Sequence, residues 1–393
     1  MNTDRYLQIA PSYEAPTTVL PLSPSSDGRT IGLGVIGLGQ FGRFCLEAYM
    51  DMPGVRIVAV ADVDPLALAA GHALAPDALA FDDASAVLAR PEVEVVAICA
   101  TPDRHLALVL AAVFAGKHVV CDKPLGVSLN EFDSAVAAAA AHNVALGVNL
   151  VLRHHPLYGA LRTLSASGVL GRPRRVAVEN YADEGVGFPA GHWLWNPAQS
   201  GGLALAADVH WFDLAARLLG PAYEINAWEA GLVEGVGSRR LATTFHAQGA
   251  VASIFHAFDT RPQATGCTVL AAFDEGEARV EGWIPTKLTV NCPGDRVAAV
   301  AALLASTAIP MVTLEDDGRA VLVLTGGEDR RCDYLEMIRT TLRGVIEQAA
   351  TGIDNNDLRG ARLATLVALA AEQAAMLRTP IQIVSEEGLE ATG

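Results

Sequence analysis

The segment GVIGLGQFGR at residues 34–43 restricts the possible folds of this chain more than any other stretch. Two registers of the G-x-G-x-x-G pattern overlap in it. Only Gly37, Gly39 and Gly42 follow an apolar run, IGLGVI, and open a helical pattern, FGRFCLEAYM. A dinucleotide site needs this order of strand, glycine turn and helix, because the pyrophosphate lies on the free N–H groups of the helix N-terminus. A tight first turn that binds nothing is the alternative.

The end of the next predicted strand meets a second requirement of a dinucleotide site. The run VRIVAVADVD places Asp62 about 20 residues beyond the last glycine, where a carboxylate accepts hydrogen bonds from the adenosine ribose. A negative charge at this position repels a 2'-phosphate. The sequence therefore favours NAD over NADP.

Apolar runs and helical patterns alternate up to about residue 150. The runs at 93–102, 118–124 and 144–150 have the short length of buried parallel strands. The alternation predicts an α/β fold with one parallel sheet and helices on both faces. Ligands of such sheets bind beyond the carboxyl ends of the strands. The predicted cofactor-binding residues are Gly37, Gly39, Gln40, Phe41, Gly42, Asp62, Thr101, Pro102, His105, Asp122, Lys123 and Asn149.

The second half of the chain has the pattern of antiparallel strands. From about residue 172 apolar and polar residues alternate, as in LATTFHAQGAVASIFHAF, with Gly249 and Gly276 at hairpin positions. A last helix is expected over 357–377, capped by Asp357 and ended before Pro380. Strands that follow a βα half predict a second domain with a large, mostly antiparallel sheet and some helices.

Length, charge and cysteine use limit the class of protein. A chain of 393 residues exceeds the usual size of one core, so we expect an extended or disordered arm over 1–30, a Rossmann domain over 31–152 and a second domain over 153–393. The net charge of -16 argues against nucleic acid and membrane as partners. The arm lacks the pattern of a signal peptide, and the six cysteines include no C-x-x-C pair, which predicts reduced thiols and a cytoplasmic protein.

Four stretches together resemble the glucose-fructose oxidoreductase, inositol dehydrogenase and rhizopine-catabolism family. They are GVIGLGQFGR, ATPDRHLALVLAAVFAGKHVVCDKP, VNLVLRHHP and SGGLALAADVHWFDLAARLLG, and with their spacing they cover about residues 31–225. The resemblance implies a Rossmann domain followed by a domain with an open antiparallel sheet. It also implies a homodimer or homotetramer, because the exposed face of that sheet makes the subunit contact in relatives.

Two residues are candidates for the chemistry of hydride transfer, which needs a group to take the hydroxyl proton. Lys123, in DKP, follows a central strand and matches the catalytic lysine of the family; it can stabilise a developing alkoxide. His210, in DVHWFD, matches the catalytic histidine, and imidazole exchanges protons near neutral pH. A solvated strand-end lysine and a buried core histidine are the structural alternatives. In relatives the peptide bond before Pro124 is often cis.

One position departs from the family pattern. Four residues before the histidine, relatives have Asp or Glu, whereas this chain has Ala206. Asp208 lies about 200° around an α-helix from that position, so it is not a simple replacement. Three interpretations follow. The lysine and the histidine suffice for the chemistry, another polar group takes the place of the missing acid, or ordinary dehydrogenase activity is lost. Asp213 shares the helical face of His210, and either orients its imidazole or forms a structural pair.

The segment at 179–202 is rich in rings and polar groups, which suit a sugar, since apolar C–H faces stack on aromatic rings while hydroxyls bind polar side chains. Burial of the two tryptophans in a hydrophobic core is an equally good interpretation of this segment. Arg153 and His155 match positions that face the cleft in relatives. The predicted substrate-binding residues are Lys123, Arg153, His155, Tyr181, Asp183, His192, Trp193, Trp195, Asp208 and His210. The histidines form no H-E-x-x-H motif, so we predict no metal.

These observations predict an NAD(H)-dependent oxidoreductase that acts on a secondary alcohol or ketone of a sugar, glycoside or cyclitol. Two further functions remain open, and both rest on the resemblance. One is an NAD-dependent glycosidase or lyase that works by transient oxidation and elimination. The other is a catalytically inactive, dinucleotide-sensing regulator, which Ala206 favours and the retained Lys123 and His210 oppose.

Overall fold

The computed structural model describes residues 30–183, 188–231, 240–247, 249–316, 318–327, 329–353 and 356–383. The predicted arm over 1–30 lies outside these residues, apart from its last position. The chain divides into two compact units. The first comprises the described residues up to Leu150 together with Leu335–Arg362, and the second comprises Val151–Tyr334 and the described residues from Leu363 onward. The predicted domain limits, 31–152 and 153–393, did not include this return to the first unit.

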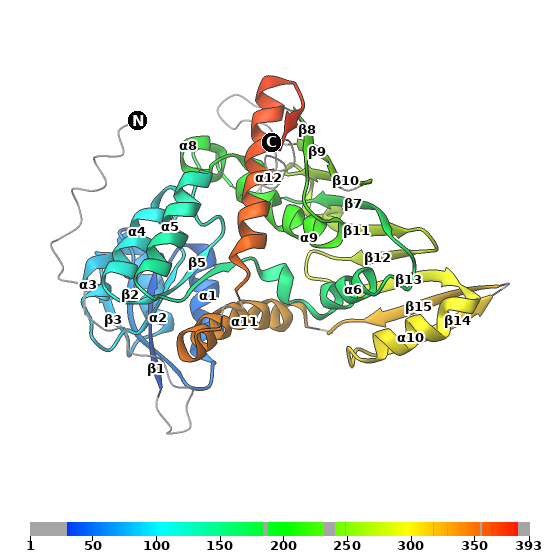
Figure 1. Cartoon of the computed structure of the whole chain (residues 1–393). Helices are drawn as coiled ribbons and strands as arrows, with labels where there is room; N and C mark the ends of the chain where they lie inside the picture. The colour runs from blue at the N-terminus through cyan, green and yellow to red at the C-terminus, as the bar shows by residue number, and fades with distance from the viewer. Residues whose placement is uncertain are drawn as a thin grey trace. The chain divides into compact units, whose positions relative to one another are not determined.

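The first unit contains the predicted parallel sheet. Its strand order is β3-β2-β1-β4-β5-β6, and every neighbouring pair is parallel. Helix α1 packs on α2, whereas α3 and α5 pack on α4, which matches the two helical layers that right-handed crossovers produce (Figure 1). The strands are β1 (Ile31–Ile36), β2 (Val55–Ala61), β3 (Leu79–Phe81), β4 (Val95–Ile98), β5 (His118–Asp122) and β6 (Leu146–Asn149). The helices are α1 (Gln40–Met50), α2 (Pro65–Leu74), α3 (Ala84–Leu88), α4 (Pro102–Phe114), α5 (Leu129–Ala141) and most of α11 (Arg330–Thr351).

Local sequence explains where these elements begin. Strands β1, β4 and β6 are buried along their whole length, as expected for strands covered on both faces. Ser128 caps α5 by accepting a hydrogen bond from the Glu131 amide (3.2 Å), and the Glu131 carboxylate accepts one from the Val127 amide (2.9 Å). These reciprocal bonds satisfy amides that the helix start leaves unpaired.

The second unit is built on a sheet of ten strands among the described residues. The order is β14-β15-β13-β12-β11-β7-β10-β9-β8-β16, and only the β7–β10 pair is parallel. This confirms the mostly antiparallel second sheet. The strands are β7 (Pro173–Tyr181), β8 (Glu224–Ala230), β9 (Arg240–Ala247), β10 (Ala250–Ala257), β11 (Gly266–Phe273), β12 (Glu277–Glu281), β13 (Lys287–Pro293), β14 (Met311–Asp316), β15 (Arg319–Thr325) and β16 (Ile381–Gln382).

Helices cover one face of this second sheet. Helix α9 packs on β7 and β10, α6 on β12 and β13, and α10 on β15 (Figure 1). Side chains alternate accordingly: Val176 and Val178 of β7 are buried, whereas Tyr181 is 39% exposed on the open face. The helices are α6 (Pro156–Ser167), α8 (Pro197–Ser200), α9 (Val209–Leu219), α10 (Val297–Ala305) and most of α12 (Leu358–Leu377). Short helical turns are η2 (Val151–His154), η3 (Trp193–Trp195), η4 (Ala204–Asp208), η5 (Pro262–Ala264) and η6 (Gly294–Arg296).

The last helix follows its prediction closely. Helix α12 starts one residue after Asp357, whose carboxylate accepts a hydrogen bond from the Gly360 amide (3.0 Å), and it ends before Pro380. None of the helices in the described part of the chain has the length and apolar character that crossing a bilayer requires. The same residues contain no group of three or more His, Cys, Asp or Glu side chains that could hold a metal ion.

Candidate active site

The glycine turn after β1 forms an open cradle at the start of α1. Gly37 has a φ of +92°, and a Cβ on Gly42 would lie 2.0 Å from the Gly37 carbonyl oxygen, so the turn itself needs both glycines. Gly39 differs, because its φ is −58° and a Cβ there would meet nothing within 4 Å. The N-cap residue of α1 is Gly39, which has no side chain that could bond the first amides of the helix. Open space at the start of a helix is what a pyrophosphate requires, so the residues fit a dinucleotide.

Asp62 lies at the rim of this cradle, directly after β2. One carboxylate oxygen accepts a hydrogen bond from the Leu38 amide (2.6 Å) and the other accepts one from the Asp64 amide (2.9 Å). The carboxylate therefore fixes the glycine turn against the end of β2. Gln40, the first residue of α1, is exposed beside the turn, and Phe41 is half-buried.

The loops after β4, β5 and β6 hold the other predicted cofactor residues. Thr101 donates a hydrogen bond to Asp103 (2.6 Å) where α4 begins, and Pro102 is the first residue of that helix. Asn149 donates to Asp122 (3.3 Å) and accepts from Thr341 of α11 (3.1 Å). Burial raises the pKa of Asp122, and the charges of Lys123 and His105 oppose this rise.

Lys123 follows the last residue of β5, and its peptide bond to Pro124 is cis, as the family resemblance implied. His105 is fully buried beneath this turn. One ring nitrogen lies 2.6 Å from the Pro124 carbonyl oxygen and the other lies 2.9 Å from that of Ala100. The structure thus gathers Lys123, His105, Asp122 and Asn149 at one edge of the first sheet, with His105 and Asn149 as its buried support.

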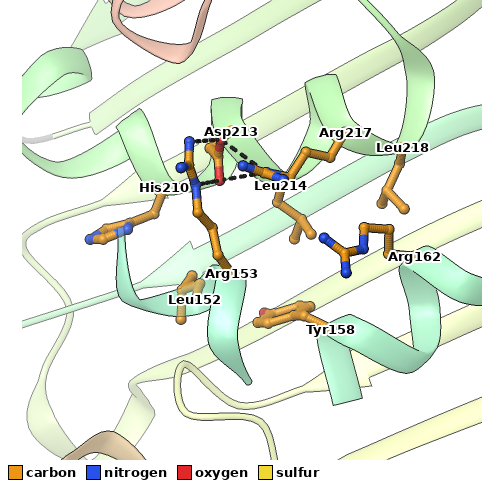
Figure 2. A pocket seen from close by; sticks show the side chains of 9 residues that line it. All are labelled: Leu152, Arg153, Tyr158, Arg162, His210, Asp213, Leu214, Arg217 and Leu218. Atoms are coloured by element: carbon orange, nitrogen blue, oxygen red, sulfur yellow. Dashed lines mark hydrogen bonds and ion pairs between the residues drawn. The ribbon is translucent and has the colours of Figure 1, made fainter. Parts of the chain in front are cut away.

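In the second unit, His210 is the second residue of α9 and is 4% exposed. Its ring meets the edge of Trp283, with centroids 5.4 Å apart. Figure 2 shows His210 on the wall of a small pocket whose lining also includes Arg153, Asp213 and Arg217. Its remaining lining residues are Leu152, Tyr158, Arg162, Leu214 and Leu218.

Asp213 forms a structural pair, which was one of its two predicted roles. Its carboxylate accepts two hydrogen bonds from Arg153 (2.8 and 2.6 Å) and two from Arg217 (3.1 Å each), as drawn in Figure 2. The side chains of Arg153 and Asp213 are 7% and 5% exposed. Arg153 is a predicted substrate contact. In the structure its guanidinium is buried in this ion pair, which holds η2 against α9.

The segment before His210 forms one turn of π-helix, η4, where the sequence predicted ordinary helix. Ala206, at the position where relatives carry an acid, packs in an apolar cluster with Trp195 and Phe258. Asp208 is fully buried and accepts a hydrogen bond from His256 Nδ1 (2.5 Å). The other ring nitrogen of His256 lies 2.8 Å from the Asn180 amide nitrogen. The Asp208 carboxylate is thus hydrogen-bonded to His256 of β10, a strand on which α9 packs.

Glu372 of α12 contacts the same turn and was missed by the sequence reasoning. Its carboxylate accepts a hydrogen bond from the Ala204 amide (2.5 Å). A Cβ on Gly202 would lie 2.1 Å from the Glu372 carboxyl carbon, so the absence of a side chain at Gly202 leaves room for this carboxyl group. Burial, together with the charges of Glu229 and Asp208, raises the pKa of Glu372 to about 7. No local pattern indicates this contact, because the two residues are 168 positions apart.

The other predicted substrate residues lie in three environments. His155 caps α6 by accepting a hydrogen bond from the Leu157 amide (3.2 Å), and burial lowers its pKa to about 4. His192 caps η3 and stacks on Phe188 with ring centroids 4.1 Å apart, while Trp193 is half-buried beside it and Trp195 is buried against Phe258. Tyr181 lies on the open face of the sheet, opposite α9, and Asp183 is exposed. The side chain of Tyr181 therefore lies on the opposite face of the sheet from α9, the helix that carries His210.

A Rossmann unit with an open glycine cradle, followed by an open-sheet unit, defines a class of two-domain nucleotide-dependent oxidoreductases. Residues 31–150 match the GFO/IDH/MocA model described as an oxidoreductase family with an NAD-binding Rossmann fold. Residues 158–278 match the C-terminal domain model of the same family. The matched segments make up more than half of the chain, and the chain belongs to this family.

Relatives of known name act on sugars and cyclitols. The chain is 33% identical over 186 residues to 1,5-anhydro-D-fructose reductase of Ensifer adhaerens, covering 46% of this chain and 55% of that protein. It is 27% identical over 192 residues to myo-inositol 2-dehydrogenase of Thermotoga maritima, covering 49% and 56%. The matches thus span little more than half the length of these relatives.

Solved structures share the fold over nearly the whole chain. Levoglucosan dehydrogenase in complex with NADH and levoglucosan superimposes with a TM-score of 0.76 at 18% identity, covering 91% of this chain and 100% of that chain. An NAD-binding oxidoreductase from Klebsiella pneumoniae gives a TM-score of 0.71 at 20% identity, with coverage of 91% and 100%. At these identities the likeness establishes the fold alone.

Proposed function

We propose that this protein is an NAD(H)-dependent oxidoreductase that transfers a hydride between nicotinamide and a secondary alcohol or ketone of a sugar, glycoside or cyclitol. One observation carries the proposal: Lys123 follows β5 at the carboxyl edge of the same sheet that presents the open cradle at Gly39. The cradle would therefore hold the pyrophosphate of one extended cofactor, and Lys123 would lie near its nicotinamide end.

When bound, NAD would supply the acceptor for the hydride that leaves the carbinol carbon. Lys123 donates a hydrogen bond to the substrate oxygen and stabilises the negative charge that develops on it. His210 takes the hydroxyl proton in oxidation and returns it in reduction, which suits an imidazole near neutral pH. Asp62 binds the adenosine ribose, and its charge favours NAD over NADP.

The substrate class rests on two kinds of support. The relatives named above are a reductase of an anhydro-sugar and a dehydrogenase of a cyclitol. The stacked rings of Phe188 and His192, with Trp193 beside them, offer an aromatic surface on which the C–H faces of a sugar can stack.

An inactive dinucleotide-sensing regulator is the second candidate, and one observation favours it. Ala206 packs in an apolar cluster at the position where relatives have an acid, and the nearby Asp208 is directed to His256. The carboxylate within η4, that of Asp208, is thus engaged with the second sheet. If the second candidate is right, NAD binds and reports on the cell's redox state with no sugar chemistry.

Single-turnover reduction separates the two candidates. The protein loaded with NAD would be mixed with a panel of sugars, glycosides and cyclitols, and NADH would be followed by its absorbance. An oxidoreductase forms NADH with at least one of these substrates. Binding of NAD without NADH formation from any of them would contradict the first proposal and favour the regulator.

We further propose a cytoplasmic homodimer or homotetramer assembled through the open face of the second sheet. That face carries exposed apolar side chains, among them Val312 (61%) and Leu314 (60%) of β14. All six cysteines are free thiols, the form that a reducing compartment maintains. Light scattering of the purified protein tests the assembly, since a monomer at all concentrations would refute it.

A further inference from the structure

His105 connects two loops of the cofactor edge through a single ring. It occupies the first turn of α4 and has no exposed surface. Its Nδ1 lies 2.6 Å from the carbonyl oxygen of Pro124, the residue after Lys123. Its Nε2 lies 2.9 Å from the carbonyl oxygen of Ala100, in the loop after β4. Both distances are those of hydrogen bonds.

The chemistry of these two partners favours one protonation state of the ring. A backbone carbonyl oxygen only accepts hydrogen bonds, and a neutral imidazole has only one N–H to donate. A neutral His105 would therefore turn a lone pair toward one of the two oxygens, in a place closed to solvent. The imidazolium donates from both nitrogens and satisfies both oxygens. We propose that His105 is a permanently charged imidazolium that holds the Lys123–Pro124 turn in position for the substrate.

A nearby negative charge stabilises a buried cation, and the Asp122 carboxyl is the acid that interacts electrostatically with His105. The charge of His105 is near enough to lower the pKa of the Asp122 carboxyl, which burial raises. Asn149 holds this carboxyl through its own bond to Thr341. The other titratable groups that interact with Asp122 are Lys123, Tyr49 and the thiols of Cys45 and Cys121. Burial raises the pKa of Tyr49 and of both thiols, so these three groups stay neutral.

One feature of the fold opposes a charge at this position. His105 lies in the first turn of α4, where the partial positive charge of a helix N-terminus disfavours a cation. Two short, charge-assisted bonds and the Asp122 carboxylate act in the opposite direction. The position of both carbonyl oxygens at hydrogen-bond distance indicates that these favourable interactions dominate.

Nitrogen-15 NMR of the histidine rings tests the charge without cofactor or substrate. In labelled wild-type protein at neutral pH, ring-to-backbone correlations identify His105, and we expect protons on both of its nitrogens. His118, buried on the same sheet, is the internal control, because its Nδ1 accepts a bond from the Ala145 amide (3.0 Å) and burial lowers its pKa to about 4. It should carry one ring proton. A single ring proton on His105 would overturn the proposal.

A pair of variants tests the positioning role, which rests on the proposed function. In His105→Asn the amide nitrogen takes the place of Nδ1 and can still donate to Pro124, whereas in His105→Gln it takes the place of Nε2 and reaches only Ala100. We expect kcat to fall about tenfold or more in the Gln variant, with NAD affinity changed less than about twofold, and to be largely kept in the Asn variant. Equal kcat in both variants and wild type would refute positioning. If no sugar is oxidised, the NMR result still decides the charge.

Discussion

Lys123 is the residue on which the proposed chemistry depends most. Truncation in Lys123→Ala removes the donor that would stabilise the substrate alkoxide, while the glycine cradle and Asp62 remain intact. We therefore predict that turnover is abolished and that the NAD dissociation constant changes little, as measured by NADH formation and calorimetry. Lys287→Ala is the control, since Lys287 is 40% exposed and pairs with Glu281. Undiminished turnover in Lys123→Ala would remove this lysine from the mechanism.

Asp62 is the residue that we propose to set the preference for NAD over NADP. Asp62→Asn removes the charge that repels a 2'-phosphate but keeps an oxygen that can accept the Leu38 amide bond. We expect the preference for NAD over NADP to fall by about tenfold, which corresponds to about 1.4 kcal/mol. Dissociation constants of both cofactors provide the measurement. Asp64→Asn, an equal charge change at an exposed cap of α2, should leave the preference as it is. An unchanged preference in Asp62→Asn would argue against the ribose contact.

The residues that could be predicted from sequence are those whose partners follow from local order. Asp62 and the glycines are separated by one strand and one helix, so the βα pattern brings them together. Asp208 could not be placed in this way, because its partner His256 lies 48 residues away on a strand whose register no local pattern fixes. The bond between Asp213 and Arg153, which are 60 residues apart, could not be predicted for the same reason.

The turn η4 and the helix α9 depend on Glu372 in a way that changes with pH. The pKa of Glu372 is raised from 4.5 to about 7, mainly by burial, so the protonated carboxyl is the form that the fold favours. Its contribution to stability is complete below about pH 4.5 and is lost as the pH rises through about 7. The full shift corresponds to about 3 kcal/mol.

Glu372→Gln removes this titration while the amide oxygen can still accept the Ala204 bond. We predict that the Tm of the variant gains on that of wild type between about pH 5 and pH 8, as measured by calorimetry. Glu281→Gln, at an exposed ion pair, is the control and should show no such trend. Parallel Tm curves for Glu372→Gln and wild type would contradict a buried, neutral Glu372.

The pattern of apolar residues was sufficient to predict which segments form helices or strands and in what order they follow one another. Periods of two and of 3.6 residues distinguish the strands of both sheets from the helices, and the sequence placed α12 within one residue of its start. The π-helical turn at Ala204–Asp208 was missed, because ALAAD has the composition of ordinary helix. The return of Leu335–Arg362 to the first unit was also missed, since an apolar stripe does not say which sheet it will cover.

The two units together account for the family to which the chain belongs. The first provides a parallel sheet whose carboxyl edge carries a glycine cradle, and the second provides a sheet covered by helices on one face and open on the other. Neither unit alone identifies a substrate, because the same folds serve many reactions. The claim on which all the others depend is that the first unit binds a nicotinamide dinucleotide.

Calorimetry of NAD binding to cofactor-stripped wild-type protein and to Gly39→Ala tests that claim directly. The added methyl group meets no protein atom within 4 Å and the backbone tolerates alanine, so the Tm should be unchanged. The methyl group would occupy the space over the first amides of α1, so NAD affinity should fall by at least about tenfold. Tight binding of NAD by wild type and its loss in a fully folded Gly39→Ala is the result we predict. Absence of NAD binding to the wild-type protein, or equal binding to both proteins, would contradict the proposed cradle.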